Sequence, residues 1–582
     1  MMQQSAALQH EMFRKRLPVV IVGMVIFSLY LLWELASFQW LSPEVRDYMD
    51  SLADANYQRS MELAAARGLI YDRNGELMSV NTLDYEIGVS PNLVTDARRA
   101  ATQLAAILNV NELEIFEKVS STQPWVSLAR PVNAEIAQQV SQLGIGGIRI
   151  DPIPRRSYPQ GTLAAQVLGF VTLALEGNYG IEGYYQDQLA GQVRDRTIST
   201  IPFELRIGGW EQDHGRDIIL TIDRDIQFLA ESELLAAINS TGARSGTVII
   251  MDPRNGEVLA MANYPSFDPN AFYDIGDPRL LANPAIGSQY EPGSVMKVLT
   301  VAAGLETGAI TPQFTYYDAQ SLNVGGINIM NWDRASHGNV DVTQVLVQSL
   351  NVGAATISTM IGPTDFYKMM SAFGIGRLTG IDLEGEALGT LYVPGDENWS
   401  ESYLATNSFG QGVAVTPLQM LTAVNAIANG GLMMQPHVVR EIRDGDQVYV
   451  SQPSALGRPI SPETANQVTQ MMVATVRDGV DAASVEGYNI AGKSGTAEIP
   501  SPVGYESGAW IMSFIGFFPA DDPQVSILIK LDRPTSGNWA SQVAAPVFQR
   551  LAERLVSLLE IPPDDIRHAL AAQGGAVNEI RR

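Results

Sequence analysis

The fold of this chain is decided by the stretch YEPGSVMK (residues 290–297), in which Ser294 and Lys297 stand three positions apart. Residues at this spacing share one face of a helix, so the hydroxyl and the amine can meet. A serine hydroxyl is a weak nucleophile until a neighbouring base takes its proton. A lysine can be that base when burial or nearby cations lower its pKa. The spacing alone is not specific, because it occurs by chance in many proteins of this length.

Two further motifs follow YEPGSVMK in the chain. SLN (residues 349–351) offers a hydroxyl that can relay a proton and an amide that can hold Lys297 or a substrate carbonyl. Any Ser-x-Asn can also be a helix cap or a turn. KSGT (residues 493–496) combines a lysine and two hydroxyls suited to a carboxylate with a glycine that lets the backbone approach a substrate. The ordered set is far more specific than any one motif, because it supplies a nucleophile, a base, a proton relay and an anion anchor.

Two competing interpretations concern the same region. GYNIAGKS (residues 487–494) matches the phosphate-binding pattern GxxxxGK[ST], which needs an apolar strand before it and a helix at its lysine. The preceding stretch is polar, and Gly495, Pro500 and Pro502 oppose a helix, so we expect no nucleotide site. His337 could serve as the base of a Ser-His pair, but no GxSxG elbow accompanies it. We expect a structural histidine, or one that supports the site without touching substrate.

Composition excludes several other classes of function. A length of 582 residues suggests roughly three or four domains, and 46% hydrophobic residues suffice for sizeable cores. The formal net charge of −25 makes a nucleic-acid partner improbable, because phosphate backbones are repelled. The chain has no cysteine, which rules out a thiolate nucleophile and disulfides. Its five histidines are scattered and form no HExxH pair, so neither zinc nor any other cofactor is expected.

The N-terminal region predicts a membrane anchor. LPVVIVGMVIFSLYLLW (residues 17–33) is apolar or small throughout, and a helix of that length spans about 25 Å, near the lower limit for a bilayer. The basic triplet at residues 14–16 places the N-terminus in the cytoplasm. We therefore expect a cytoplasmic tail (1–16), a single transmembrane anchor (17–38) and a body on the outer, periplasmic or cell-wall face of the cytoplasmic membrane. A cleaved signal peptide is the alternative, although ELAS (residues 34–37) is a poor cleavage site.

Hydrophobic patterning predicts strands at both ends of the larger domain, with helices between them. The expected elements are a helical stalk (42–66), a hairpin around DRNG (67–80), a second hairpin (246–252 and 256–262), broken helices (294–372), two neighbouring buried strands (510–518 and 524–531), a helix (543–559) and a loosely held polar tail (563–582). This order indicates an α+β or mixed α/β fold.

The three motifs are similar to the SxxK, SxN and KTG set of the serine penicillin-binding proteins and β-lactamases. Longer stretches make the chain resemble class B penicillin-binding proteins, on the division-type (FtsI-like) branch. These stretches are RGLIYDRNGELMS (67–79), RRSYPQG (155–161), GIEGYYQDQLAG (180–191), MDPRNGEVLAMANYPSFDPN (251–270), SFGQGVAVTPLQM (408–420) and AAPVF (544–548). SLNVG (349–353) and SFGQG favour the division-type branch.

The resemblance implies a fold and a set of roles. It implies an elongated, β-rich non-catalytic pedestal of the dimerisation type (39–240) and a β-lactamase-like transpeptidase domain (241–562). The implied roles are Ser294 as nucleophile, Lys297 as general base, Ser349 as proton relay, Asn351 for positioning the lysine and the substrate, Lys493 for the substrate carboxylate and the proton network, Ser494, Gly495 and Thr496 for substrate binding, and the backbone N–H groups of Ser294 and Thr496 as the oxyanion hole. Ser494 stands where threonine is commoner in the family, and both hydroxyls can serve.

The same resemblance implies substrates and partners. We expect peptidoglycan stem peptides ending in D-Ala-D-Ala, inhibition by β-lactams, and a SEDS-type (FtsW-like) membrane glycosyltransferase with other division proteins as partners. A carboxypeptidase or β-lactamase would pass the same acyl group to water, and a β-lactam sensor would retain the domain for binding alone. The pedestal and anchor argue against a free β-lactamase, and the short cytoplasmic tail argues against a sensor.

Overall fold

A computed structural model describes residues 18–19, 21–34, 58–63, 66–191, 194–199, 214–501 and 504–572 of the chain. The chain divides into two compact units, and the first comprises residues 1–65 and 192–214. In this unit residues 18–19 and 21–34 are helical, and β1 (Gln58–Leu63) pairs antiparallel with β8 (Arg194–Ser199).

Two sequence predictions fall on this first unit. The helical stalk predicted for residues 42–66 is wrong at 58–63, because those residues bond to a distant strand partner instead. Residues 42–57, 64 and 65 lie outside the described part of the chain. The predicted cytoplasmic tail (1–16) and residues 17, 20 and 35–38 of the predicted anchor lie outside it as well. Among the described residues, no helix has the length and apolar character needed to cross a bilayer.

The second unit contains a long mixed sheet. Its strand order is β18 (Gln447–Val450), β17 (Val439–Asp444), β9 (Asp217–Leu220), β2 (Ile70–Tyr71), β3 (Leu77–Val89) and β4 (Val126–Val132), with β5 (Ile148–Ser157) also pairing β3. The hairpin predicted around DRNG is confirmed between β2 and β3. Asp72 Oδ1 accepts hydrogen bonds from the N–H groups of Asn74 and Glu76, and Gly75 adopts a φ of +89°, which glycine tolerates best.

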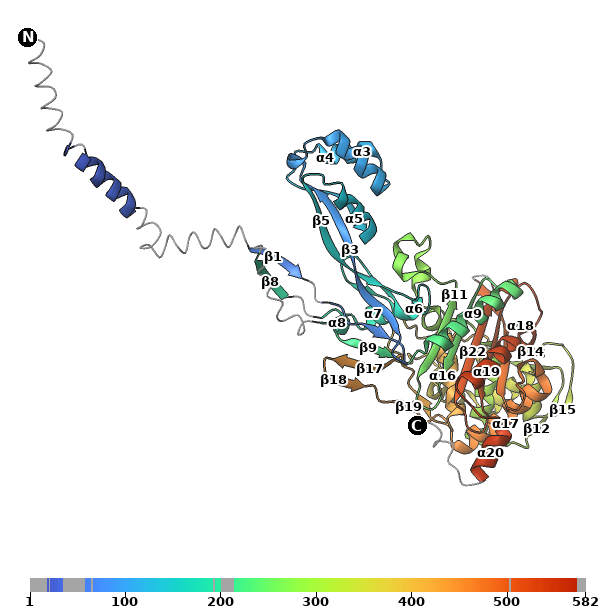
Figure 1. Cartoon of the computed structure of the whole chain (residues 1–582). Coiled ribbons are helices and arrows are strands. Elements are labelled where there is room, and N and C mark those ends of the chain that lie inside the picture. Colours follow the sequence, from blue (N-terminus) through green and yellow to red (C-terminus); the bar gives the residue numbers. More distant parts are fainter. Residues whose placement is uncertain are drawn as a thin grey trace, which may run out of the picture. The chain divides into compact units, whose positions relative to one another are not determined.

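Three short helices cover one end of β3, β4 and β5 (Figure 1). They are α3 (Ala97–Leu108), α4 (Glu112–Val119) and α5 (Ala134–Gln142). Each begins at a side chain that accepts a hydrogen bond from the first turn, namely Asp96, Asn111 and Asn133. Ile87 and Leu104 are fully buried in the core that these helices share with the sheet.

A buried ionic cluster lies within the same unit, near the other end of β3. The carboxylate of Glu182 pairs with Arg67 Nε at 2.6 Å and with Arg156 Nε at 2.7 Å. Glu182 is fully buried, and the Tyr158 hydroxyl approaches the same carboxylate at 3.4 Å. We call Arg67, Arg156, Tyr158 and Glu182 the Glu182 cluster. It joins the start of this unit to β5 and to α7 (Gly180–Tyr184).

A five-stranded antiparallel sheet forms the centre of the larger domain. Its order is β11 (Val258–Tyr264), β10 (Ser245–Met251), β22 (Val525–Asp532), β21 (Gly504–Phe518) and β20 (Ala491–Ser501). The predicted hairpin at 246–262 and the predicted strand pair at 510–531 are confirmed. Successive side chains point to opposite faces, so Val248 and Ile250 enter one apolar core and Ile249 and Met251 the other.

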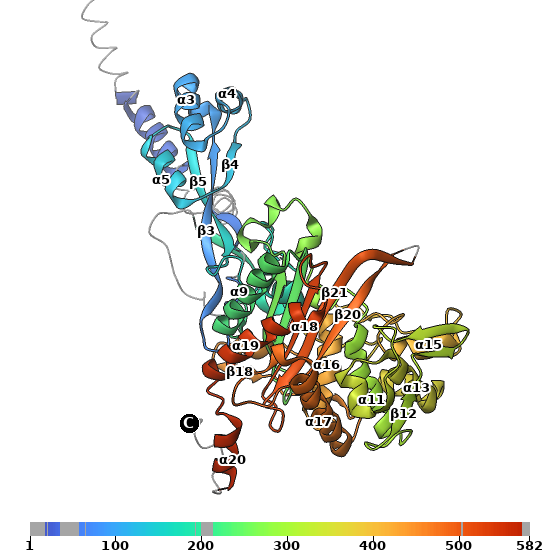
Figure 2. The same cartoon turned by 90° about the vertical axis from the view of Figure 1, so that its right-hand side faces the viewer.

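Helices cover both faces of this sheet (Figure 2). The core that contains Val248 includes α9 (Arg224–Thr241) and α19 (Ala545–Leu558), and the latter confirms the helix predicted at 543–559. The core that contains Ile249 includes α11 (Met296–Glu306), α16 (Pro417–Ala428) and α17 (Pro462–Gly479). The α+β architecture of the prediction is therefore confirmed.

Two further predictions need correction. The region 294–372 is helical at α11, α12 (Val342–Val347), α13 (Asn351–Ile361) and α14 (Pro363–Ala372), but it also contains short paired strands at 315–318, 321–324, 327–330 and 338–341. Those strands are short and only partly buried, so they carry little apolar periodicity. The tail is not loosely held at α20 (Asp564–Ala572), because buried Asp564 accepts hydrogen bonds from Asn489 and pairs with Arg567. Residues 573–582 lie outside the described part.

Candidate active site

Ser294 lies in η5 (Gly293–Val295), a single turn that leads directly into α11. Gly293 has a φ of +57°, and a Cβ atom there would lie 2.9 Å from the Thr496 carbonyl oxygen. A Cβ on Gly410 would lie 2.2 Å from the Gly293 carbonyl oxygen. Glycines at these positions therefore allow three backbone segments to meet around the half-buried Ser294.

Lys297 follows one turn later and is completely buried. Its Nζ donates to the Ser349 backbone oxygen at 2.6 Å and to Ser349 Oγ at 3.2 Å. Ser349 has a φ of +57°, a left-handed conformation that few non-glycine residues adopt. This conformation presents both oxygens of Ser349 to the same amine, so the strained backbone serves the contact between the first two motifs.

Lys493 reaches Ser349 from the third motif. It lies in β20, at the edge of the five-stranded sheet, and only 1% of its surface is exposed. Its Nζ donates to Ser349 Oγ at 3.2 Å and to the Ser494 backbone oxygen at 3.0 Å. A lysine inside a strand cannot open a helix, so the expectation that GYNIAGKS is no phosphate-binding loop is confirmed.

The two lysines form a buried cationic pair without an acidic partner within the described residues. Burial lowers the pKa of Lys297 well below its usual value, and the nearby Lys493 lowers it further. Burial also lowers the pKa of Lys493, to about 7. Both effects act in the same direction because a desolvated ammonium is costly and a second cation makes it costlier. Both effects therefore favour the neutral amine of Lys297.

The hydrogen bonds of Lys297 indicate which proton transfer its neutral amine can make. A neutral lysine amine has two N–H donors and one lone pair, and Lys297 already directs its donors to Ser349. The lone pair is left to take a proton. Ser349 Oγ accepts from both lysines, so its own O–H proton remains available for donation.

The KSGT segment packs closely against the start of α11. A Cβ atom on Gly495 would lie 2.8 Å from both the Pro292 carbonyl oxygen and Val295 Cγ2, so only glycine permits the approach. Ser494 and Thr496 are half-buried, and Thr496 Oγ1 accepts a hydrogen bond from the Ala540 N–H at 3.2 Å. The first N–H groups of a helix have no partner inside it, so the Ser294 N–H is free of its own helix, and the preceding residue, Gly293, approaches the Thr496 backbone closely.

Two predicted site residues have different contacts from those expected. Asn351 is the first residue of α13, and its Nδ2 donates to the Met330 carbonyl oxygen at 3.0 Å. No hydrogen bond joins Asn351 to Lys297 in the part of the chain that the structure describes. The Ser294 hydroxyl likewise makes no hydrogen bond to Lys297 or Ser349 there. His337 lies beside Asp333 at 3.0 Å and contacts none of the three motifs through a hydrogen bond.

Sequence reasoning missed three residues near the motifs. Glu291 is 7% exposed and accepts hydrogen bonds from the Gly412 N–H at 2.9 Å and the Tyr505 hydroxyl at 3.1 Å. Burial raises the pKa of Glu291, despite those hydrogen bonds. Glu291 and Gly412 belong to the stretches YEPGSVMK and SFGQG, but nothing in either stretch indicates that they touch.

The other two are Trp332 and Trp539, which meet edge to face with ring centroids 5.1 Å apart. Trp332 Nε1 donates to the backbone oxygen of Gln348, the neighbour of Ser349. Trp539 precedes Ala540, whose N–H bonds to Thr496. The pair therefore links the surroundings of the second and third motifs, and no local signal in the sequence predicts it. Among the described residues, no group of three His, Cys, Asp or Glu side chains could hold a metal.

Fold and geometry together define a serine acyl-transfer enzyme. Comparison with known proteins gives the family. A model of the penicillin-binding protein transpeptidase domain matches residues 246–553, and a model of the penicillin-binding protein dimerisation domain matches residues 62–200. The chain belongs to the class B penicillin-binding proteins, in the division-type branch.

Individual relatives agree with this assignment. The chain is 32% identical to stage V sporulation protein D of Bacillus subtilis, over 94% of this chain and 86% of the relative. It is 29% identical to the peptidoglycan D,D-transpeptidase FtsI of Escherichia coli, over 94% of this chain and 92% of that relative. A crystal structure of penicillin-binding protein 3 from Mycobacterium tuberculosis complexed with aztreonam superposes with a TM-score of 0.66 at 29% identity, covering 86% of this chain and 97% of the other.

Proposed function

We propose that this chain is a peptidoglycan D,D-transpeptidase that forms an acyl-enzyme on Ser294 and transfers the acyl group to an amine of a neighbouring stem peptide. The observation that carries the proposal is the single hydroxyl of Ser349, which accepts hydrogen bonds from both Lys297 and Lys493. That contact joins all three motifs around one exchangeable proton.

In the acylation step Lys297 Nζ takes the proton of the Ser294 hydroxyl as the oxygen attacks the carbonyl of the penultimate D-alanine. The backbone N–H groups of Ser294 and Thr496 stabilise the oxyanion, an effect of about 3 kcal/mol for one such donor. The Ser349 hydroxyl donates a proton to the leaving amine of the terminal D-alanine and is reprotonated from the lysine pair. The C–N bond breaks, and the ester to Ser294 remains.

The substrate binds along the edge of β20. The terminal carboxylate of the stem peptide is held by the hydroxyls of Ser494 and Thr496, with the charge of Lys493 behind them, and Gly495 lets the peptide lie against the strand. Asn351 lies at the start of α13 and can orient the substrate from the opposite wall. In the second step the acceptor amine attacks the ester carbonyl and loses its proton to Lys297. The C–O bond to Ser294 breaks, and the Ser294 oxygen takes a proton back from the lysine.

Mass spectrometry tests the acyl-enzyme. The full chain is incubated with benzylpenicillin beside the Ser294→Ala variant, and intact masses are measured. One covalent adduct on the wild type and none on the variant is the expected result. A folded wild type that takes no adduct would contradict the assignment of Ser294. A donor peptide with an acceptor amine then separates the enzyme classes, because a carboxypeptidase yields only hydrolysed peptide in the presence of the amine.

The proposal extends to location and partners. The apolar run at residues 17–33 and the basic triplet before it support a single-pass anchor with the catalytic domain on the outer face of the cytoplasmic membrane. Such an anchor would place the enzyme beside a SEDS-type (FtsW-like) glycosyltransferase and other division proteins. Retention in the membrane pellet at alkaline carbonate pH, lost on deletion of residues 1–41, is expected. Release of the full chain by carbonate would contradict the predicted anchor. Depletion that gave rounded rather than filamentous cells would contradict the proposed division role.

A further inference from the structure

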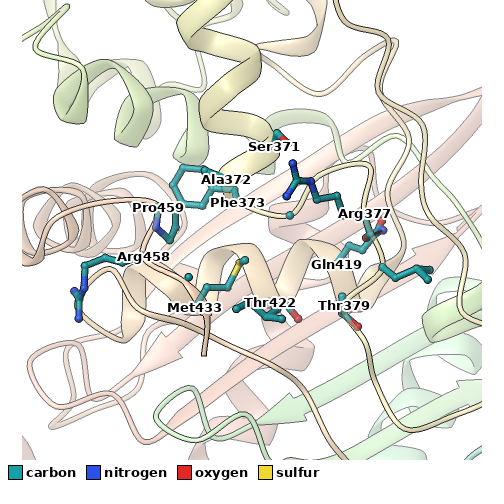
Figure 3. Close-up of a pocket in the computed structure, with 14 residues that line it drawn as sticks. Ser371, Ala372, Phe373, Arg377, Thr379, Gln419, Thr422, Met433, Arg458 and Pro459 are labelled. Carbon is teal, nitrogen blue, oxygen red and sulfur yellow. Dashed lines mark hydrogen bonds between the residues drawn. The ribbon is translucent and has the colours of Figure 1, made fainter. Parts of the chain in front are cut away.

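A second cavity lies apart from the three motifs, between α14, α16 and the short strands β16 (Met433–Met434) and β19 (Ala455–Gly457) (Figure 3). Its volume is about 370 Å³, within the range of small-molecule sites. None of the residues that line it belongs to the motifs of the active site. The proposed transpeptidase reaction gives this cavity no role.

Charge distinguishes this cavity from the rest of the molecule. Its lining, all within the described residues, includes Arg377 and Arg458 and no aspartate or glutamate. The whole chain carries 63 acidic against 38 basic side chains, whereas this lining holds two exposed arginines and no acid. Within the described residues the Arg377 guanidinium has no hydrogen-bond or ion-pair partner. Arg458 donates to the Gly430 backbone oxygen at 2.5 Å, and its other donors have no partner among the residues that the structure describes.

Apolar surface completes the lining. Phe373 and Met433 are 1% and 4% exposed and form its buried part. Leu378 and Leu456, at 52% and 41% exposed, belong to its exposed part. Exposed leucines beside unpaired guanidinium groups match a ligand with an apolar body and an anionic head.

Polar groups in the lining are arranged in advance of any ligand. Thr422 is 3% exposed, and its hydroxyl has no hydrogen-bond partner in the described part of the chain, which is costly for a buried group. Gln419 Nε2 donates to the Arg377 backbone oxygen at 2.5 Å and to the Leu388 backbone oxygen at 2.7 Å. The main chain that carries Arg377 is therefore fixed to the buried helix α16, which reduces the ordering cost of binding.

We propose that this cavity binds a small amphiphilic carboxylate, with the carboxylate on Arg377 and the apolar chain against Phe373 and Met433. A planar carboxylate matches the fork of a guanidinium, whereas a phosphate without an apolar body would leave the leucines uncovered. The site also adjoins the catalytic framework. Gln419 Oε1 accepts from the Thr416 N–H, and the neighbouring Val415 pairs with Tyr290, four residues before Ser294.

Ligand-observed NMR of hexanoate with the full chain in lipid nanodiscs tests the proposal, with empty nanodiscs as the blank. Hexanoate should bind with a Kd of about 1 mM, whereas hexylamine, its charge-reversed match, and inorganic phosphate should bind at least about tenfold more weakly. Binding should persist after benzylpenicillin has filled the active site. Loss of hexanoate binding on penicillin treatment, or equal binding of hexylamine, would overturn the proposal.

Two variants locate the ligand. Arg377→Gln should weaken hexanoate binding about tenfold, whereas Arg98→Gln, an exposed arginine on α3, should leave it unchanged. Thr422→Val removes the unpartnered hydroxyl at nearly constant volume, so the unfolding midpoint should hold or rise while hexanoate binds about threefold more weakly. Equal affinity in the wild type and Arg377→Gln would place the ligand elsewhere and refute the assignment.

Discussion

Two buried charge clusters in this molecule differ in whether their charges have partners of opposite sign. In the Glu182 cluster one carboxylate lies between two arginines at 2.6 and 2.7 Å. In the active site two buried lysines share the hydroxyl of Ser349, and no carboxylate pairs with them in the described part of the chain. A partner of opposite charge stabilises a buried charge, whereas a second cation nearby favours the neutral form of a buried lysine. The first arrangement holds elements in place, and we propose that the second supplies the base.

The largest expected effect comes from removing that base. Lys297→Met should lower the second-order rate of acylation by a fluorescent penicillin about 10⁴-fold, since general-base catalysis contributes up to about that factor. The fold should persist, because methionine fills the same apolar space. The control is Lys368→Met, an exposed lysine on α14, which should acylate at the wild-type rate. Near-normal acylation in Lys297→Met would contradict the role of the base.

Breaking the Glu182 cluster should cost stability rather than chemistry. Glu182→Gln leaves two buried guanidinium groups without their charge partner, which should lower the free energy of unfolding by about 3–5 kcal/mol. Denaturant titration of the variant measures this loss. The matched control is Glu114→Gln, whose partner Lys118 lies four residues later on the exposed face of α4, and whose cost is about 0.3 kcal/mol. Equal losses of unfolding free energy in the two variants would show that the buried Glu182 cluster stabilises the fold no more than an exposed ion pair does.

Removing the Ser349 hydroxyl that the two lysines share separates the proton relay from the base. Ser349→Ala retains the backbone oxygen that accepts from Lys297 but removes the group that joins the two lysines. We expect about 10²-fold slower acylation, less than for Lys297→Met, because the base survives while the relay is lost. Ser336→Ala, outside the motifs, serves as the control in the same rate assay. A Ser349→Ala variant as inactive as Lys297→Met would mean that the hydroxyl is itself indispensable to the base.

The smallest effect concerns pH and stability. The pKa of Lys493 is lowered to about 7, so above that pH the unfolded chain binds the extra proton and the folded chain does not. Folding stability should therefore rise with pH between about 7 and 10.5, by at most about 1.4 kcal/mol per pH unit for this group. Comparing unfolding curves of the wild type and Lys493→Met from pH 7 to 9 isolates the slope. Parallel pH dependence in both proteins would mean that Lys493 stays protonated when folded.

The local hydrophobic pattern was sufficient to predict those helices and strands whose apolar side chains lie on one face. The strand pair at 510–531 and the helix at 543–559 were predictable because alternation and helical spacing directly report burial. The hairpin at 67–80 was predictable because Asp72, Asn74 and Gly75 carry the turn themselves. The strands at 58–63 and at 315–341 were not, since their partners lie elsewhere in the chain and determine their conformation.

For the active site, the sequence by itself determined which functional groups are present and in what order. Serine, lysine, a second serine and a second lysine in three motifs limit the chemistry to acyl transfer. Only the tertiary structure decided their electrostatics. Complete burial of Lys297, the left-handed backbone of Ser349 and the approach of Lys493 depend on packing between segments far apart in the chain. A pKa responds to solvent and neighbouring charges in space, and neither is recorded in a linear motif.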